Sequence, residues 1–426
     1  MRKDRSPWTA LAFGLLLGSS AGFGEPAAPR AFDPRTLVTE NTRELFLTEE
    51  GLKGPGLDFI IREAAGARYV LLGEPHNTDE VNRFTAALFV ALQERHGFRY
   101  LALEQGPLII QRYGSPPFRG NLAAIRRDVA AGYHRAMHFA TDEELALLAA
   151  VGAASRAEGS PLWGFDRSLG AELGLSELAE ALEDPKAKKR TLAVLEQARE
   201  HEARVEAEHG PEEARGERFL GADSAPFDEL LATLDPPSGS RAATILQQLR
   251  SSRRDLRRYQ VEHPPGEPWG YLSNLDREEL MKRNFASHLR EAKRSSSETP
   301  KVLVKAGHWH VVQGRNRGNV MTLGTALDGA ADLAGSDSFS IAITVANEPG
   351  QHWTITDFED YAFIHHVADP GAWKIVDLRP LHPWIHAGEL ELPKPALEYV
   401  WGYDALLILG NTRRGTHTWI GRPSPP

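Results

Sequence analysis

The sequence predicts an α/β protein with a mixed, largely parallel central sheet that is flanked by helices and carries a long helical insertion. Two observations predict this fold class. Short, wholly apolar runs bounded by Gly or Pro are typical of strands buried on both faces, and the chain holds several of them. The region from about residue 170 to 295 differs, because Glu, Arg, Lys and Ala dominate it at helical spacing.

The first elements predict a βαβ unit. The apolar run YVLLG ends at Gly73, and apolar residues then recur at helical spacing between residues 81 and 92 before Gly97 ends the pattern. The segment FRYLALEQG supplies a second strand, which ends in Glu104. Such an order predicts a parallel strand pair with a right-handed crossover.

The remaining elements follow in the same way. Residues 141–160 predict a helix, with Thr141 and Glu144 as a capping box, and PLWGFD predicts a short third strand that ends at Asp166. We expect residues 170–295 to form several helices over the sheet. Strand character returns in KVLVKAGHWHVVQG, DSFSIAITVA, AWKIVDLRP and YDALLILG.

The first 24 residues predict a secretory signal peptide. Arg2, Lys3 and Arg5 precede an apolar stretch too short to span a membrane comfortably, and small residues follow. An uncleaved membrane anchor is the alternative. We expect a secreted or periplasmic protein in which residues 25–426 form a single domain, with no stable membrane insertion once the signal is removed.

Composition excludes several classes of site. The chain is 41% hydrophobic and 25% charged, as in soluble globular proteins, and its net charge of −9 argues against a nucleic-acid partner. It has no cysteine, which excludes disulfides, thiolate zinc sites and a cysteine nucleophile. Its G-x-S-x-G match at residues 18–22 lies in the predicted signal peptide and not at a strand end, and the chain lacks the P-loop, HExxH and a GxGxxG after a strand.

Ionisable residues end four of the predicted strands. Ligands of open α/β sheets bind at the carboxyl ends of the strands, so these side chains are expected to meet. In an extended segment, two histidines at positions i and i+2 would project to one side. Converging carboxylates and imidazoles shift one another's pKa values, as general acid–base chemistry requires. The residues concerned are Glu74, His76, Glu104, Asp166, Arg167, His308 and His310.

The segment LLGEPHNTDEVNRFTAALFVALQERHGFRYLALEQG resembles the opening core of the erythromycin esterase-like proteins. Those carry a Gly-Glu strand end, a His, a Glu four residues later, a downstream Arg, then HGF, a strand and a second Glu. Three further segments follow in the family's order: PLWGFDRS, REELMKRNF, and KVLVKAGHWHVV with MTLGTAL. Glu278 stands where the second of these segments usually has Asp. Together they cover most of residues 65–345.

The resemblance implies an ester-cleaving site that needs no metal or other cofactor. His76 would be the general base that deprotonates water, and Glu74 would orient and polarise the reacting group. His310 would face them from the later strand and stabilise the carbonyl oxygen. Glu104 would complete this catalytic cluster, together with Arg83 as a further member of the polar group. The predicted contacts to a small-molecule substrate are Arg83, Glu80, Asp166, Arg167 and His308.

Two departures from the esterase pattern leave alternatives open. One residue separates Glu74 from His76 where the esterases usually have two, and Gly307 stands where they have the first His of His-Asn-x-His. Both differences resemble the related ChaN-like haem-uptake proteins and Tiki-type metalloproteases. The alternatives are therefore a haem- or ligand-binding protein, with Trp309 beside two histidines, and a hydrolase with zinc or manganese. Its metal ligands would be Glu74, His76, His308 and His310.

We expect replacement of His76 or Glu74 by Ala to abolish turnover with little loss of stability, because both residues are expected at the rim of the sheet.

Overall fold

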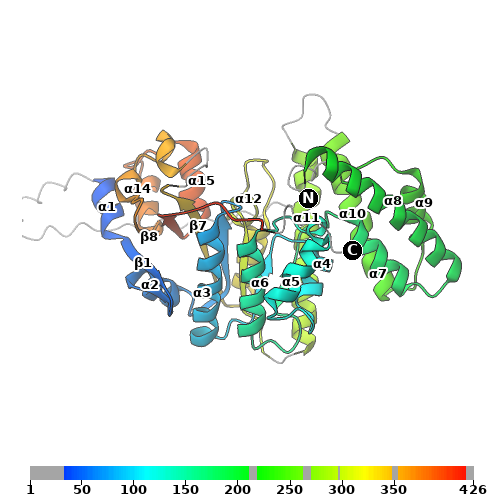
Figure 1. The fold of residues 1–426 in the computed structure, drawn as a ribbon. Helices are drawn as coiled ribbons and strands as arrows, with labels where there is room; N and C mark the ends of the chain where they lie inside the picture. Colours follow the sequence, from blue (N-terminus) through cyan, green and yellow to red (C-terminus); the bar gives the residue numbers. More distant parts are fainter. Residues whose placement is uncertain (1–32, 211–217, 262–269, 296–297, 348–353, 419–426) are drawn as a thin grey trace, which may run out of the picture. The chain divides into compact units, whose positions relative to one another are not determined.

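A nine-stranded sheet forms the centre of the molecule in the computed structural model, which describes residues 33–210, 218–261, 270–295, 298–347 and 354–418 (Figure 1). The predicted signal peptide lies outside the described residues. The strand order is β2-β1-β8-β9-β7-β3-β6-β4-β5. The strands are β1 (Thr42–Thr48), β2 (Gly51–Lys53), β3 (Ala67–Glu74), β4 (Tyr100–Leu103), β5 (Leu162–Gly164), β6 (Val302–Gly307), β7 (Asp337–Val345), β8 (Trp373–Asp377) and β9 (Ala405–Leu409).

Strands β9, β7, β3, β6, β4 and β5 run parallel, and β8, β1 and β2 add an antiparallel edge. This confirms the predicted mixed, largely parallel sheet. Every residue of β3, β4, β6 and β9 is buried, as their continuous apolar runs indicated. The hairpin β1–β2 was not predicted, because TRELFLT places two charged residues before a short apolar stretch and only Leu45 in it is buried.

Helices alternate with most of the strands along the chain, and a group of helices that follows β5 and precedes β6 makes the helical insertion. In this group α10 contacts α7 and α11, while α11 contacts β5. The helices are α1 (Pro34–Glu40), α2 (Pro55–Glu63), α3 (Asp79–His96), α4 (Pro107–Tyr113), α5 (Leu122–Ala130), α6 (Asp142–Ala154), α7 (Ala171–Ala181), α8 (Pro185–His209), α9 (Ala225–Thr233), α10 (Arg241–Val261), α11 (Tyr271–Ser295), α12 (His308–Val311), α13 (Leu323–Leu333), α14 (His382–His386) and α15 (Lys394–Gly402). Within the described ranges, no helix is both long and apolar enough to cross a membrane.

The end of α3 and the start of α6 carry two of the helix-end signals that the sequence contains. Helix α3 ends at Gly97, whose φ of 73° is the left-handed conformation that glycine adopts without strain. At the start of α6 the Thr141 hydroxyl accepts the backbone N–H of Glu144 at 3.1 Å. Only this half of the predicted capping box is observed, because the Glu144 carboxylate instead accepts a hydrogen bond from Lys305 of β6.

Strand register brings the site residues to one edge. In the parallel pair β3–β6, Glu74 lies opposite Gly307 and Leu72 opposite Lys305. In the pair β4–β6, Leu103 also lies opposite Lys305, so Glu104 follows at the same height. The carboxyl ends of three adjacent strands therefore present their polar residues together.

Residues 411–418, here called the C-terminal strap, lie across the N-termini of α3 and α6. The backbone N–H of Asp79 donates to the carbonyl of Arg413 at 2.9 Å, and that of Gly415 donates to Asn77 at 2.6 Å. The backbone N–H of Asp142 donates to Thr416 at 2.7 Å. Figure 1 shows the strap in dark red in front of these two helices. It ties the end of the described chain to the loop that follows His76.

Candidate functional site

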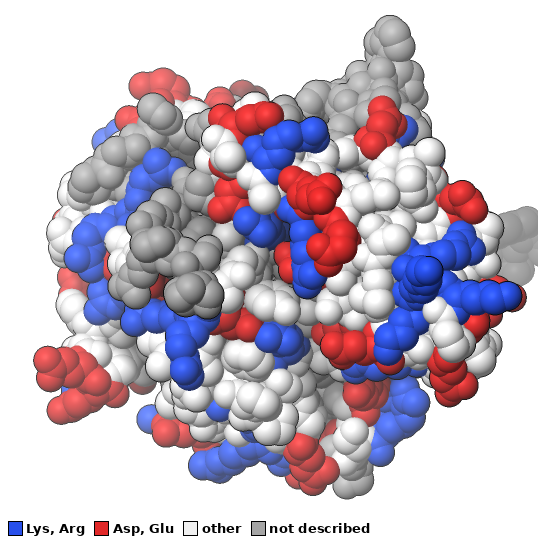
Figure 2. Space-filling view, turned by 45° about the vertical axis from the view of Figure 1, so that its right-hand side comes forward, with Lys and Arg blue, Asp and Glu red and all other residues white. Residues whose placement is uncertain are grey.

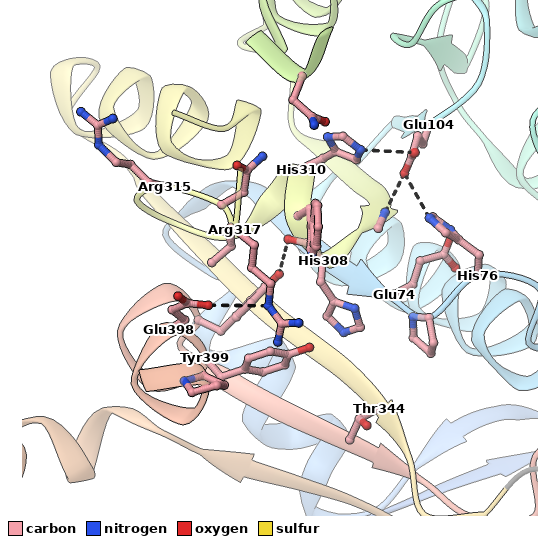
Figure 3. A pocket seen from close by; sticks show the side chains of 18 of the residues that line it. Glu74, His76, Glu104, His308, His310, Arg315, Arg317, Thr344, Glu398 and Tyr399 are labelled. Atoms are coloured by element: carbon pink, nitrogen blue, oxygen red, sulfur yellow. Dashed lines mark hydrogen bonds and ion pairs between the residues drawn. The ribbon is translucent and has the colours of Figure 1, made fainter. Parts of the chain in front are cut away.

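A cavity of about 760 Å³ opens where β3, β4 and β6 end. Its polar end is built by residues of these strands, of α11 and of α12, and Figure 3 shows the side chains of His76 and His310 on either side of Glu104. The polar residues at this end are Glu74, His76, Glu104, Arg277, His308 and His310.

Glu104 is the buried centre of this cluster. Its Oε2 accepts the backbone N–H of Gly307 at 2.7 Å, and its Oε1 accepts Nη2 of Arg277 at 2.7 Å. Nε2 of His310 lies 3.5 Å from Oε1, and Nε2 of His76 lies 3.7 Å from Oε2. Burial favours a higher pKa, but His310, His76 and Arg277 outweigh it and hold the pKa of Glu104 at about 2. Glu104 is therefore a fixed negative charge near neutral pH.

His76 is the imidazole of the cluster that a ligand can reach. Its Nδ1 lies 3.2 Å from Oε1 of Glu74, and its ring stacks on Phe139 with the centroids 4.2 Å apart. The side chain is 33% exposed, whereas those of Glu74 and Glu104 are buried. A carboxylate at Nδ1 fixes the tautomer in which Nε2 carries the free lone pair, and Nε2 lies on the side of Glu104.

Glu74 is buried and does not lie at an open rim, which corrects the expectation stated above. Its Oε1 accepts a hydrogen bond from Nζ of Lys305 at 2.9 Å. Burial favours a higher pKa, but Lys305 and His76 together lower the pKa of Glu74 below its ordinary value. Removal of Glu74 would leave Lys305 with one carboxylate fewer in a dry environment, so a Glu74→Ala chain is expected to lose stability as well as any turnover.

Arg277 joins Glu104 to Asp166. Its Nη2 and Nε donate to the two carboxylate oxygens of Asp166 at 2.6 and 3.0 Å. Burial opposes ionisation, but Arg277 and His138 lower the pKa of Asp166, which is wholly buried. Asp166 lies behind the guanidinium and is not among the residues that line the cavity, so it holds Arg277 in place instead of meeting a ligand.

His308 and His310 do not share one face, contrary to the prediction from an extended segment. The chain leaves β6 at Gly307 and turns into the short helix α12, where residues two apart point in different directions. Nε2 of His308 lies 2.7 Å from the carbonyl oxygen of Ile343, and burial lowers the pKa of His308 to about 4. His308 is therefore neutral near pH 7.

The surroundings of His310, in contrast, favour its protonated form. Its Nδ1 lies 2.7 Å from Oε1 of Glu278, and its Nε2 faces Glu104. Burial favours a lower pKa, but Glu104 and Glu278 raise the pKa of His310 above its ordinary value despite Arg277. The other oxygen of Glu278 accepts the backbone N–H of Leu323 at 2.7 Å, which fixes the carboxylate at the start of α13.

The other predicted substrate contacts divide between the cavity and the outside. Arg167 lines the cavity and pairs with Asp255 of α10. Arg83 is exposed on α3 and is not part of the cavity lining. Glu80 is buried beneath the C-terminal strap, where it accepts the backbone N–H of Arg413 at 2.8 Å. The structure therefore does not bring Glu80 and Arg83 to the cavity.

Sequence reasoning gave no role to Lys305, Glu144, Arg277 or Glu278. Arg277 and Glu278 lie in the segment REELMKRNF, which was used only for the resemblance. Lys305 offered a signal of its own, because a lysine inside the apolar run KVLVKAG must find buried partners. Glu144 was explained by helix capping alone.

The cofactor alternatives do not fit this geometry. In the part of the chain that the structure describes, no three His, Asp or Glu side chains form a group suited to a metal ion. The set predicted for a metal does not assemble, because the His308 ring is engaged by Ile343. For haem, Nε2 of His76 is an imidazole nitrogen in the cavity, and the ionised Glu104 carboxylate lies 3.7 Å from it, whereas a haem would require an apolar slot around its ligand.

Comparisons with known proteins address the fold. No family model and no curated protein matches the sequence. The chain is similar to a solved structure of a Bacillus cereus protein, with 16% identity and a TM-score of 0.57 over 90% of this chain and 98% of that one. It is also similar to a succinoglycan biosynthesis protein, with 13% identity and a TM-score of 0.54 over 90% of this chain and 97% of that one.

A third similar structure is a mutant of the erythromycin esterase EreC in its open conformation. The identity is 13% and the TM-score 0.52, over 89% of this chain and 99% of that one. The fold is that of the erythromycin esterase-like proteins. The predicted superfamily is thus supported at the level of the fold, and at these identities the likeness concerns the fold alone.

Proposed function

We propose that this protein is a hydrolase that cleaves an ester or lactone of a small molecule with water activated by His76. The observation that carries the proposal is the position of the His76 ring. Glu74 holds it at Nδ1, and Nε2 lies in the cavity 3.7 Å from the ionised Glu104. The erythromycin esterase with the same fold makes ester or lactone cleavage the reaction class to test first.

The reaction begins with a water molecule between His76 and Glu104. It donates one hydrogen to Nε2 of His76 and the other to Glu104, so its oxygen lone pair is directed at the substrate carbonyl. As the carbon–oxygen bond forms, His76 takes the proton, and Glu74 stabilises the resulting imidazolium. When the ester bond breaks, His76 returns that proton to the leaving oxygen.

Positive charge next to Glu104 stabilises the oxyanion that forms when water adds to the substrate carbonyl. Arg277 lines the cavity beside Glu104, and the carboxylates Glu104 and Glu278 favour the protonated form of His310 between them. A preorganised cation at a developing oxyanion lowers the barrier by about 3 kcal/mol in comparable sites. Glu104 thus has two tasks: it orients the water and it fixes both cations.

The rest of the cavity determines what kind of substrate fits. Trp309, Phe358, Tyr361 and Tyr399 also line it, and Figure 3 shows the ion pair of Arg317 with Glu398 beside Tyr399. An aromatic wall next to a polar reacting end suits an ester with a bulky apolar portion. On the face in Figure 2, acidic and basic side chains are interspersed, which fits a small-molecule substrate better than a nucleic acid.

The helical insertion contributes to this wall, because Tyr259 of α10 and Asn274 of α11 also line the cavity. We propose that the insertion sets the size of substrate that is accepted. Replacing Tyr259 by Ala should then change the ranking of substrates with different acyl groups, and an unchanged ranking would contradict this.

A panel of aryl, alkyl and glycosyl esters and of lactones tests the proposed reaction. Wild-type protein should hydrolyse at least one member, and His76→Gln should lower kcat by about a thousandfold or more with an unchanged melting temperature. The matched control is His386→Gln, an exposed histidine of α14 outside the cavity. Wild-type protein without turnover across the panel, or a fully active His76→Gln chain, would refute the proposal.

The alternatives have their own readouts. Haem added to purified protein should produce no Soret shift that depends on His76, and metal analysis of unsupplemented protein should find no stoichiometric, chelator-sensitive ion. Either result reversed would favour the corresponding binding protein or metal hydrolase. We also propose export with removal of about 24 residues, which the mass of the protein recovered from the periplasm or medium tests.

A further inference from the structure

Lys305 lies directly behind Glu74, the carboxylate that holds the candidate general base His76. Its ammonium donates to Oε1 of Glu74 at 2.9 Å and to Oε2 of Glu144 at 3.0 Å. The side chains of all three residues are at most 3% exposed, so one buried cation serves two buried carboxylates. Buried ion pairs contribute little net stability, which makes a cation at this position unusual unless it serves the site.

Oε1 of Glu74 is the shared atom of this arrangement. The same oxygen that accepts the Lys305 ammonium lies 3.2 Å from Nδ1 of His76. Lys305 on β6 therefore fixes the carboxylate oxygen that in turn fixes the ring. Because β3 and β6 are in register here, neither side chain can shift along the strands independently.

We propose that Lys305 is a positioning residue for His76: it holds Glu74 in the orientation that meets the ring, and Glu144 on α6 competes for the same ammonium. This deepens the proposed function and depends on it, because the base to be positioned is the one that activates water. The ionisable groups nearest the trio are His76, Glu104 and His308.

The charge states of Lys305, Glu74 and Glu144 agree with the roles proposed for them. Burial favours a lower pKa for Lys305, but Glu144 and Glu74 raise it, so Lys305 stays protonated. The pKa of Glu74 is lowered, whereas burial and the charge of Glu74 raise the pKa of Glu144 despite Lys305. The carboxylate next to His76 thus keeps its charge more firmly than its competitor.

Glu144→Gln tests the competition and keeps the size of the side chain. With one negative charge removed, the low-pH limb of the pH–rate profile should move to lower pH by about one unit. The same shift should occur in the pH dependence of the His76 ring signal in NMR spectra, identified by its loss in His76→Gln. The proposal would be overturned if the low-pH limb of the rate profile and the pH dependence of the His76 ring signal were the same in Glu144→Gln as in wild type.

Lys305→Met combined with Glu144→Gln tests the positioning. This double variant leaves the net formal charge of the trio unchanged, so it removes the hydrogen bond without stranding a second carboxylate. We expect kcat to fall about tenfold or more with little change in KM, because Glu74 no longer has a fixed orientation. A wild-type kcat in the double variant would overturn the proposal.

Lys301→Met is the matched control, since Lys301 precedes the same strand but donates to the carbonyl of Ala65 outside the cavity. It should keep the wild-type profile. If wild-type protein hydrolyses no ester, the proposed function fails, but the NMR arm still decides the coupling. A Glu144→Gln shift of the ring signal then supports the role of Lys305, and an unshifted signal refutes it.

Discussion

Gly307→Ala should disable the site while leaving the fold intact. A Cβ at this position would lie 2.7 Å from Nε2 and 2.9 Å from Cε1 of His76, and 3.4 Å from Oε2 of Glu104. Ordinary contact begins near 3.4 Å, so the ring must move by about 0.7 Å. A displacement close to 1 Å at a reacting group costs about a hundredfold in rate, which is the expected loss in kcat/KM.

Stability should change little in this variant. The backbone at Gly307 has φ −56° and ψ 149°, which alanine adopts without strain. The partly exposed His76 ring can swing into the cavity, so the overlap is relieved by losing one hydrogen bond, worth about 1 kcal/mol. Lower entropy of the unfolded chain offsets most of this, and the free energy of unfolding should stay within about 1 kcal/mol of wild type.

The assay pairs turnover of the best ester with urea unfolding. Gly159→Ala is the control, because a Cβ there meets no atom within 4 Å, and it should leave both quantities unchanged. Full activity in Gly307→Ala would show that the position of the His76 ring does not matter. A large loss of stability would show that the ring cannot move as argued.

Three further predictions concern single residues of the site. The pKa of Glu104 is about 2 against an ordinary 4.5, so its ionised form contributes stability that is fully present above pH 4.5 and is lost as the pH falls toward 2. This contribution is on the order of 3 kcal/mol. The urea midpoint should therefore fall less between pH 5 and pH 3 in Glu104→Gln than it does in wild type. Arg277→Met leaves Glu104 and Asp166 without their shared cation and should lower the free energy of unfolding by about 3–5 kcal/mol; an unchanged thermal midpoint would contradict the bonds described. His308→Gln should change kcat by less than about tenfold, because His308 is neutral and bonded to Ile343, whereas complete loss of activity would favour the metal-site alternative.

The fold could be predicted because its central strands carry an unambiguous signal. YVLLG and ALLIL are continuous apolar runs, and both lie in strands in which every residue is buried. The hairpin β1–β2 escaped prediction because β1 buries only one residue in seven and contains no such run. Strand-end residues were brought together since parallel strands in register end at one height.

For the candidate site, the sequence predicted which residues meet better than it predicted where their side chains point. Glu74, His76, Glu104 and His310 line one cavity, as expected from their strands. The orientation of His308 could not be predicted, because it depends on whether the chain after Gly307 stays extended or coils into α12. Lys305 and Glu144 were missed for a related reason: their partners lie more than 150 residues away in the chain, and no local pattern reveals such a pair.

The C-terminal strap has a consequence for how the site is held. Its contacts with Asn77 and Asp79 fasten the loop just after His76, although residues 411–418 are not among the residues that line the cavity. The position of the His76 ring therefore depends on a segment that meets no ligand itself, so changes far from the cavity in sequence can act on the imidazole through this loop.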